Sequence, residues 1–278
     1  MLREFDSPGL ARNVECGTRQ NQHLGARSTR TVIIVVGLAF EARIAAGAGT
    51  YVICGRNVIW SEEGEEFAIS RAVLKNCRGI ISFGVAGGLL PNMSAGTCVV
   101  GSEILSGTAR WAVDPDWSEN LLSAIPTAIH GKIVGASAPI AHPQAKRALH
   151  ADSGAVAVDM ESHIVARMAA AHGLPFAAVR VITDPAEHRL PQAAVAAMRP
   201  NGTIDIAAMI RSVIRRPYEL RALMQAARDV NAARSMLLRT RKALDAVLNR
   251  SDGRTLEIGP MRNPMPERDL PLTVVELC

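Results

Sequence analysis

Apolar residues along this chain follow two patterns: short continuous runs, and sets spaced three or four residues apart. The runs are rich in β-branched side chains and have the length of strands covered on both faces; they lie at residues 31–36, 79–83 and 176–182. Helical spacing is clearest at residues 164–172, and Gly173 follows as a natural helix stop. Buried strands that alternate with amphipathic helices predict an α/β domain.

Shorter patterns complete the expected elements. Further strands are expected at residues 51–54, 57–60, 97–107, 131–137 and 155–158. Further helices are expected at residues 65–76, 119–125 and 142–150. Loops are expected at residues 111–117 and at residues 186–203, the second with a short helix. Gly84, Gly87 and Gly88 predict a loop after the strand at 79–83, where glycine would let the backbone approach a ligand closely.

Composition divides the chain into four regions. Their bounds are residues 1–30, 31–215, 216–250 and 251–278. The first and last regions lack periodicity, which predicts a disordered extension and a poorly ordered tail. The second contains the α/β pattern. The third is a basic amphipathic helical extension, and Pro217 predicts a break between two helices that begin near residue 204.

Charge is distributed unevenly. The formal net charge is +5, yet residues 206–250 alone carry nine Arg and one Lys against three acidic residues. The rest of the chain is therefore slightly acidic, and the basic extension indicates a local contact with an anionic surface. Aromatic residues make up only 4% of the chain. Without an aromatic stacking platform we expect no nucleic-acid binding.

Targeting signals and cysteine spacing narrow the class of protein. No apolar run reaches the roughly 20 residues that span a bilayer, and the N-terminal segment has no continuous apolar core of a secretory signal. The five cysteines are scattered and show no metal-ligand spacing. We therefore expect reduced thiols, a cytoplasmic protein and no bound metal.

Candidate chemistry is concentrated in residues 157–185. Asp159 and Glu161 flank Met160 at the start of a helix, and Asp184 follows a buried strand. Ligands of open α/β sheets bind beyond the carboxyl ends of the strands, so the pattern predicts a site with an acid at a strand end and another at a helix start. The simpler interpretations are helix capping for Asp159, a first-turn helix carboxylate for Glu161, and a helix N-cap or an Asp-Pro turn for Asp184.

Three motifs carry a family resemblance, in the order G-V-A-G-G (84–88), V-D-M-E-S (158–162) and V-R-V-I-T-D (179–184). Over residues 31–215 the chain resembles the nucleoside phosphorylase/nucleosidase superfamily, and within it the methylthioadenosine/S-adenosylhomocysteine nucleosidases. The segments GLAFEARIA, FGVAGGL and VITDPAEHRLP look more narrowly like the hopanoid-associated phosphorylases, which act on adenosylhopane, a lipid carrying a 5′-linked adenosine. The resemblance implies a three-layer α/β/α sandwich around a mixed, largely parallel β-sheet, with a helical C-terminal extension.

The resemblance also implies roles for site residues. Asp184 matches the acid that protonates purine N7, a step that a poor anionic leaving group requires. Thr183 replaces the more usual serine beside it. Glu161 matches the carboxylate that binds the ribose hydroxyls, and Met160 matches the residue that packs on the sugar. The backbone expected to approach base or sugar belongs to Phe83, Gly84, Val85, Ala86 and Gly87.

Two departures from the family pattern concern the sugar and the nucleophile. Val85 stands where many relatives carry Ser or Thr, so a hydroxyl contact is missing. The phosphorylases often have G-D-P-x-R after the first strand, whereas this chain has Gly37-Leu-Ala-Phe-Glu41. A carboxylate suits orientation of water and opposes phosphate, so Glu41 is the second predicted catalytic residue. Arg43 and Arg56 could instead bind phosphate, and as the simpler interpretation they are surface charges.

The expected function is cleavage of the purine N-glycosidic bond of a 5′-modified adenosine, adenosylhopane above all, with hydrolysis favoured over phosphorolysis. The alternatives are a methylthioadenosine/S-adenosylhomocysteine nucleosidase, a purine nucleoside phosphorylase, or a catalytically idle nucleoside-binding protein. No cofactor is expected apart from inorganic phosphate as the alternative co-substrate. The family implies a homo-oligomer. Residues 217–248 either pack on the body or on a second subunit, or lie on the inner face of the membrane.

Overall fold

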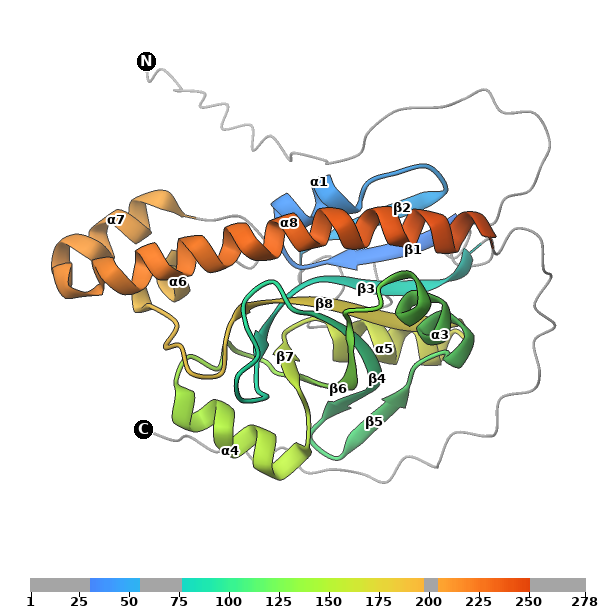
Figure 1. The fold of residues 1–278 in the computed structure, drawn as a ribbon, viewed down its shortest axis with the longest axis horizontal. Coiled ribbons are helices and arrows are strands. Elements are labelled where there is room, and N and C mark those ends of the chain that lie inside the picture. The colour runs from blue at the N-terminus through green and yellow to red at the C-terminus, as the bar shows by residue number, and fades with distance from the viewer. Residues whose placement is uncertain (1–30, 56–76, 198–204, 251–278) are drawn as a thin grey trace, which may run out of the picture.

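The computed structural model describes residues 31–55, 77–197 and 205–250 (Figure 1). The predictions of disordered ends, of a strand at 57–60 and of a helix at 65–76 lie outside the described residues. Arg56 also lies outside them.

The described strands and helices follow the predicted order, with shifted ends. The strands are β1 (Thr31–Val36), β2 (Thr50–Cys54), β3 (Cys77–Gly88), β4 (Cys98–Ser106), β5 (Ala109–Ala112), β6 (Ile129–Gly135), β7 (Ala157–Asp159) and β8 (Phe176–Asp184). The helices are α1 (Ala39–Ala45), α3 (Pro115–Ala124), α4 (Pro143–Ser153), α5 (Ser162–Ala171), α6 (Gln192–Ala197), α7 (Ile206–Arg215) and α8 (Leu220–Arg250), with a 3-10 turn, η2 (Pro217–Glu219), before the last.

The strands form one mixed sheet in the order β2-β1-β3-β7-β6-β4-β5, and β8 pairs with both β3 and β4. Five of the pairings are parallel, and the β3–β7, β4–β5 and β4–β8 pairings are antiparallel. The expected mixed, largely parallel sheet is thus confirmed. Because β3 pairs with β7 as well as with β8, strands β3, β8, β4, β6 and β7 also close into a ring.

Helices cover both faces of the sheet, and alternate side chains of each strand enter one of two cores. In β1, Ile33 and Val35 pack in the core that includes α5, while Val32, Ile34 and Val36 pack in the core that includes α8. Figure 1 shows α8 in front of β1 and α5 behind the sheet, so these two helices cover opposite faces. Burial of both faces explains why β1 is a continuous apolar run.

The loop predicted at Gly84, Gly87 and Gly88 is wrong, because β3 continues to Gly88. Gly87 and Gly88 pair with β7 while the same strand remains paired with β8. A Cβ atom at Gly87 would lie 3.3 Å from Val158 Cγ1. These glycines allow two strands to lie close to β3, instead of ending it.

The loop predicted at residues 111–117 is also partly wrong. Strand β5 runs to Ala112, and α3 begins at Pro115 with Asp114 as its N-cap. The Trp117 amide donates to Asp114 Oδ1 over 3.0 Å. Sequence inspection placed this helix start four residues too late because the capping acid and the N-terminal proline were assigned to the loop.

The C-terminal region contains two helices separated at Pro217, as predicted. Helix α8 lies along the body and buries Ala233, Leu237 and Leu244. Arg241 Nε donates to the Ala45 carbonyl over 2.8 Å. Much of α8, which makes up most of the basic extension, therefore packs on the α/β domain. Within the described residues, no helix combines the length and apolar character needed to cross a bilayer.

Two adjacent leucines test the packing of α8. Leu237 is fully buried, whereas Leu238 is 46% exposed. We expect Leu237→Ala to lower the free energy of unfolding by about 2–5 kcal/mol, because it leaves a cavity under the helix. Leu238→Ala should cost less than about 1 kcal/mol. Urea unfolding followed by circular dichroism measures both, and equal losses would contradict this packing.

Candidate functional site

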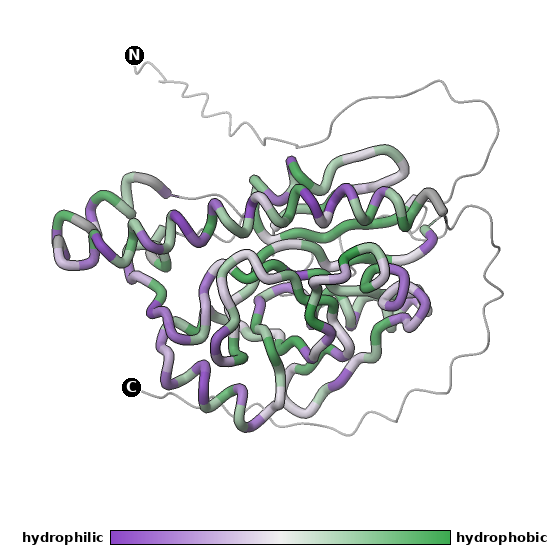
Figure 2. The backbone as a smooth tube through the Cα atoms, in the orientation of Figure 1, coloured by the Kyte–Doolittle hydropathy of each residue, from purple (hydrophilic) through white to green (hydrophobic). Residues whose placement is uncertain are grey.

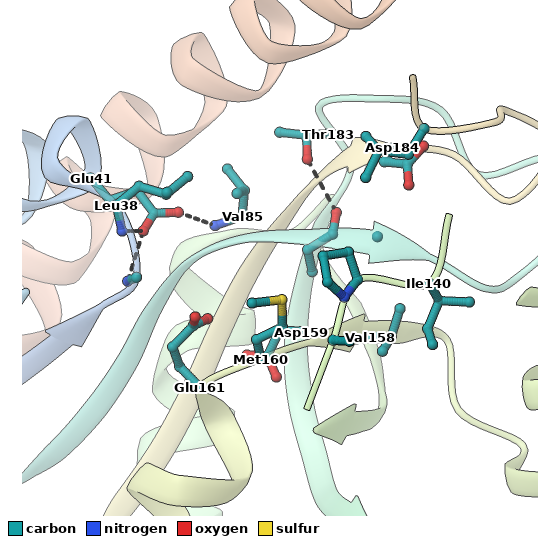
Figure 3. Close-up of a pocket in the computed structure, with 16 residues that line it drawn as sticks. Leu38, Glu41, Val85, Ile140, Val158, Asp159, Met160, Glu161, Thr183 and Asp184 are labelled. Atoms are coloured by element: carbon teal, nitrogen blue, oxygen red, sulfur yellow. Dashed lines mark hydrogen bonds between the residues drawn. The ribbon is translucent and has the colours of Figure 1, made fainter. Parts of the chain in front are cut away.

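A pocket lies at the carboxyl ends of β1, β3 and β8 and at the turn between β7 and α5 (Figure 3). Its described lining consists of Gly37, Leu38, Glu41, Val85, Ala86, Gly87, Ala138, Pro139, Ile140, Val158, Asp159, Met160, Glu161, Thr183, Asp184 and Leu190. In the view of Figure 3, Glu41 and Glu161 lie on one side, Asp184 lies on the other, and Met160 lies between them. The fold thus brings together acids that are far apart in the sequence.

Glu41 is a buried carboxylate held by backbone amides. It is 1% exposed, and its Oε1 accepts from the Val85 amide over 2.7 Å. Its Oε2 accepts from the amides of Gly37 and Leu38 over 3.0 Å and 2.8 Å. Burial raises the pKa of Glu41 above its ordinary value, although Arg180 and these three amides oppose the rise. A fixed carboxylate with a raised pKa is suited to accept a proton.

Arg180 lies behind this side of the pocket, and sequence inspection missed it. The side chain is fully buried in β8. Its Nη2 lies 2.5 Å from Asp159 Oδ2 and 4.0 Å from Glu161 Oε2. The same guanidinium donates to the hydroxyls of Ser82 and Ser162. The available signal was a lone charged residue within an apolar strand, since such a charge requires partners.

Gly84 allows Arg180 and Glu41 to approach each other. A Cβ atom at this position would lie 2.6 Å from Glu41 Oε1 and 2.8 Å from Arg180 Nη1, and its φ of +153° favours glycine. Among the described residues, Arg180 Nη1 has no hydrogen-bond partner. The strand therefore places a cation beside the Glu41 carboxylate without a hydrogen bond between the two groups.

The turn between β7 and α5 positions the remaining acids of this side. Asp159 accepts from the Ser162 amide over 3.1 Å and from its hydroxyl over 2.5 Å. Asp159 therefore accepts from the first amide of α5, although the N-cap residue of that helix is Glu161, and Asp159 also pairs with Arg180. Glu161 is 8% exposed and lines the pocket. Gly37 lies against it, since a Cβ atom there would be 2.8 Å from Glu161 Oε1.

Asp184 forms the other side of the pocket and pairs with Lys146 of α4, which does not line the pocket itself. Asp184 Oδ2 lies 2.6 Å from Lys146 Nζ, whose side chain is fully buried. Burial raises the pKa of Asp184, and the Lys146 ammonium opposes that rise. The simpler interpretation of Asp184 as only a turn residue is incomplete, because its side chain enters this ion pair. Sequence inspection missed Lys146, which is one basic residue in an amphipathic helix and gives no local signal.

The other predicted residues divide into two groups. Thr183, Val85, Ala86, Gly87 and Met160 line the pocket with the acids. Thr183 Oγ1 is 3.5 Å from the Ala86 carbonyl.

Phe83, Gly84 and Arg43 do not line the pocket. Phe83 is fully buried in the core that includes α8. Arg43 is exposed on α1, which fits its interpretation as a surface charge. The prediction also omitted an apolar part of the lining, formed by Ala138, Pro139, Ile140, Val158 and Leu190. Across the described segments, no group of His, Cys, Asp and Glu side chains is arranged to hold a metal ion.

A family model described as the phosphorylase superfamily matches residues 62–215, more than half of the chain. The chain belongs to the phosphorylase superfamily. The matched region contains the glycines of β3, Glu161, Arg180 and Asp184, and it begins after Glu41. No curated protein matches the chain.

Solved structures share this superfamily fold at low sequence identity. Futalosine hydrolase of Helicobacter pylori is 12% identical, with a TM-score of 0.54 over 80% of this chain and 98% of that chain. The 5′-methylthioadenosine/S-adenosylhomocysteine nucleosidase of the same organism is 12% identical, with a TM-score of 0.55 over 81% and 100%. The corresponding nucleosidase of Neisseria meningitidis is 15% identical, with a TM-score of 0.53 over 78% and 99%.

The Arg180 cluster predicts a pH-dependent loss of stability on substitution. We expect Arg180→Met to lower the free energy of unfolding at pH 8 by about 3–5 kcal/mol, because it leaves buried carboxylates without their cation. Removing the cation raises the pKa of Glu41 further. A carboxyl group with a raised pKa in the folded state destabilises that state where it is ionised, so the loss should shrink at pH 5.

Urea unfolding at both pH values measures this loss. Arg110→Met is the matched control, because Arg110 is 57% exposed and lies 3.9 Å from Glu103; it should cost less than about 1 kcal/mol. A loss for Arg180→Met that does not change with pH would contradict the carboxylate explanation.

Proposed function

We propose that this phosphorylase-superfamily member hydrolyses the purine N-glycosidic bond of a 5′-modified adenosine and releases adenine. One observation carries the proposal: a single pocket has a half-buried acid, Asp184, on one side and two buried carboxylates, Glu41 and Glu161, on the other. Bond cleavage of this kind needs a proton at the leaving base and negative charge near the developing sugar cation.

Asp184 supplies the proton in this mechanism. Its raised pKa favours the protonated form, which can donate to N7 of the base as the C1′–N9 bond breaks. Glu161 binds the ribose hydroxyls and stabilises positive charge on the ring. Met160, between the two sides, packs against the sugar. Thr183 and the backbone of Val85, Ala86 and Gly87 complete the walls.

Water is the proposed nucleophile because the pocket is acidic. Four carboxyl groups, those of Glu41, Asp159, Glu161 and Asp184, belong to its described lining. Like charges disfavour binding of a phosphate dianion at such a site. Glu41 can accept a proton from water, and Arg180 behind it favours the ionised carboxylate. Exposure of Arg43 outside the lining also weakens the phosphate alternative.

Adenosylhopane is the substrate we propose first. The proposal rests on three segments, GLAFEARIA, FGVAGGL and VITDPAEHRLP, which resemble hopanoid-associated phosphorylases. A methylthioadenosine/S-adenosylhomocysteine nucleosidase is the second candidate, and the nucleosidases among the similar solved structures favour it. Adenine release from adenosylhopane, methylthioadenosine and S-adenosylhomocysteine distinguishes the two. Strict dependence on phosphate, with a sugar 1-phosphate as product, would overturn hydrolysis.

The acid role of Asp184 is tested by Asp184→Asn. We expect kcat for adenine release to fall by about 10²–10⁴-fold, because the amide cannot donate a carboxyl proton to the base. Asp116→Asn, at an exposed position of α3, should keep the parental rate. Parental activity in Asp184→Asn would contradict the mechanism.

A peripheral contact with an anionic bilayer through α7 is a further part of the proposal. Ile210, Ile214 and Tyr218 are 54%, 73% and 76% exposed. Figure 2 shows α7 at one end of the molecule, with hydrophobic and hydrophilic residues side by side. Arg211 and Arg215 alternate with the isoleucines, so an apolar face has basic flanks, as a membrane-surface helix requires. The sequence placed this contact at residues 217–248, but α8 buries part of that segment.

The α7 contact is tested with the double variant Ile210→Ser/Ile214→Ser. We expect it to lose most of its binding to phosphatidylglycerol vesicles, because the apolar face is removed. Leu238→Ser, an exposed leucine on α8, should bind like the parent. If α7 instead covers a second copy of this chain, the double variant would change the mass measured by light scattering, and vesicle binding would be absent from the parent protein.

A further inference from the structure

We infer that Lys146 is a positioning residue for Asp184: it fixes the carboxyl group and the turn that follows, and it provides the countercharge once the proton has left. The inference rests on the proposed role of Asp184 as the acid. Nothing in the family motifs of this sequence includes Lys146, which comes from α4.

Lys146 contacts both the side chain of Asp184 and the backbone of the turn that follows it. Its Nζ lies 2.6 Å from Asp184 Oδ2. It also donates to the carbonyls of Pro185 and His188 over 2.8 Å and 3.0 Å, and lies 3.2 Å from the carbonyl of Asp184 itself. Every partner is an acceptor, which requires an ammonium with its three donors. One buried cation therefore holds the whole turn from Asp184 to His188.

Placement of Lys146 is not explained by stability alone. The side chain is fully buried, and burying an ammonium is costly unless it is paired. It also lies in the first turn of α4, where the helix dipole disfavours a positive charge. A methionine of similar length would avoid both costs. The ion pair with Asp184 offsets them and at the same time sets the properties of the proposed acid.

Several charged groups face Asp184 from the surrounding elements. Lys146 comes from α4, His188 from the turn, and Asp229 from α8. His188 Nδ1 lies 3.1 Å from Asp229 Oδ2, so these two side chains are paired with each other near the turn. Glu187 accepts from the Asn92 amide over 2.9 Å and faces Lys146. Of these four groups, Lys146 is the one whose charged atom contacts the Asp184 carboxylate directly, over 2.6 Å.

The positive charge of Lys146 matters at the step in which the C1′–N9 bond breaks. The bond electrons go to the base, the Asp184 proton goes to N7, and neutral adenine leaves. Asp184 becomes a carboxylate beside the Lys146 ammonium, so the new negative charge is already paired. Water adds its hydroxyl to C1′ and its proton passes to Glu41. Before the next turnover Asp184 takes up a proton from solvent and Glu41 releases one to it, which restores both groups.

Two leaving groups separate this role from a purely structural one. For Lys146→Met we expect kcat with adenosylhopane to fall by about 10–100-fold with little change in KM, a smaller effect than loss of the acid itself. With 4-nitrophenyl β-D-ribofuranoside, whose leaving group needs no proton, the rate should change by less than about threefold. Lys146→Met added to Asp184→Asn should cause no further loss.

The pH profile gives an independent measurement. Because the Lys146 ammonium lowers the pKa of Asp184, its removal should move the alkaline limb of kcat/KM for adenosylhopane to higher pH. Lys132→Met is the control, since Lys132 pairs with Glu103 over 3.3 Å at a site 44% exposed. It should change neither the rates nor the profile. If Lys146→Met does not fold, Lys146→Gln, which keeps amide donors without the charge, takes its place.

Equal losses with both leaving groups, or an unmoved alkaline limb, would overturn the inference and leave Lys146 a structural residue. An Asp184→Asn protein with parental adenine release would instead overturn the proposed function. The two failures are therefore distinguishable, because the first is measured with Asp184 intact and the second with Lys146 intact.

Discussion

The buried guanidinium of Arg180 is the interaction on which one side of the pocket depends. It pairs with Asp159 and lies close to Glu161 and Glu41. Three acids from two segments, α1 and the β7–α5 turn, would repel one another in a water-excluded site, and a central cation reduces that repulsion. Gly84 is part of the same arrangement, since a side chain there would collide with both Arg180 and Glu41. Gly84 thus leaves room for the Arg180 guanidinium beside the Glu41 carboxylate.

The opposite side of the pocket repeats this principle with a different cation. Lys146 reaches Asp184 from α4, whereas Arg180 belongs to the strand that ends in Asp184. Each acid therefore has a buried positive partner. Burial raises the pKa values of Glu41 and Asp184, and the nearby cation, Arg180 or Lys146, lowers them. Such paired environments allow one carboxyl group to hold a proton while another remains a base.

The C-terminal helices connect this pocket to the outer surface. Asp229 of α8 contacts His188, which lies on the turn held by Lys146. Farther along, α8 is anchored by Leu237, Leu244 and Arg241. The exposed apolar face belongs mainly to α7 and the first turns of α8, which lie beyond this anchor (Figure 1). The basic extension thus has two parts: the later turns of α8 pack on the α/β domain, and α7 with the first turns of α8 exposes apolar side chains that are available to partners.

Local patterns in the sequence determined the buried strands β1 and β8, the helix after Glu161, the break at Pro217 and the acids at their ends. Those features depend on side-chain periodicity and on backbone preferences within a few residues. Only the tertiary structure decided that β3 continues through its glycines, that Phe83 faces the core, and that Arg180 and Lys146 join the site. Each of these depends on contacts between distant segments, such as the contact of Lys146 with Asp184, which are 38 positions apart in the sequence. Burial and ion pairing depend on which segments pack around a residue in the folded protein, so a single stretch of sequence does not determine them.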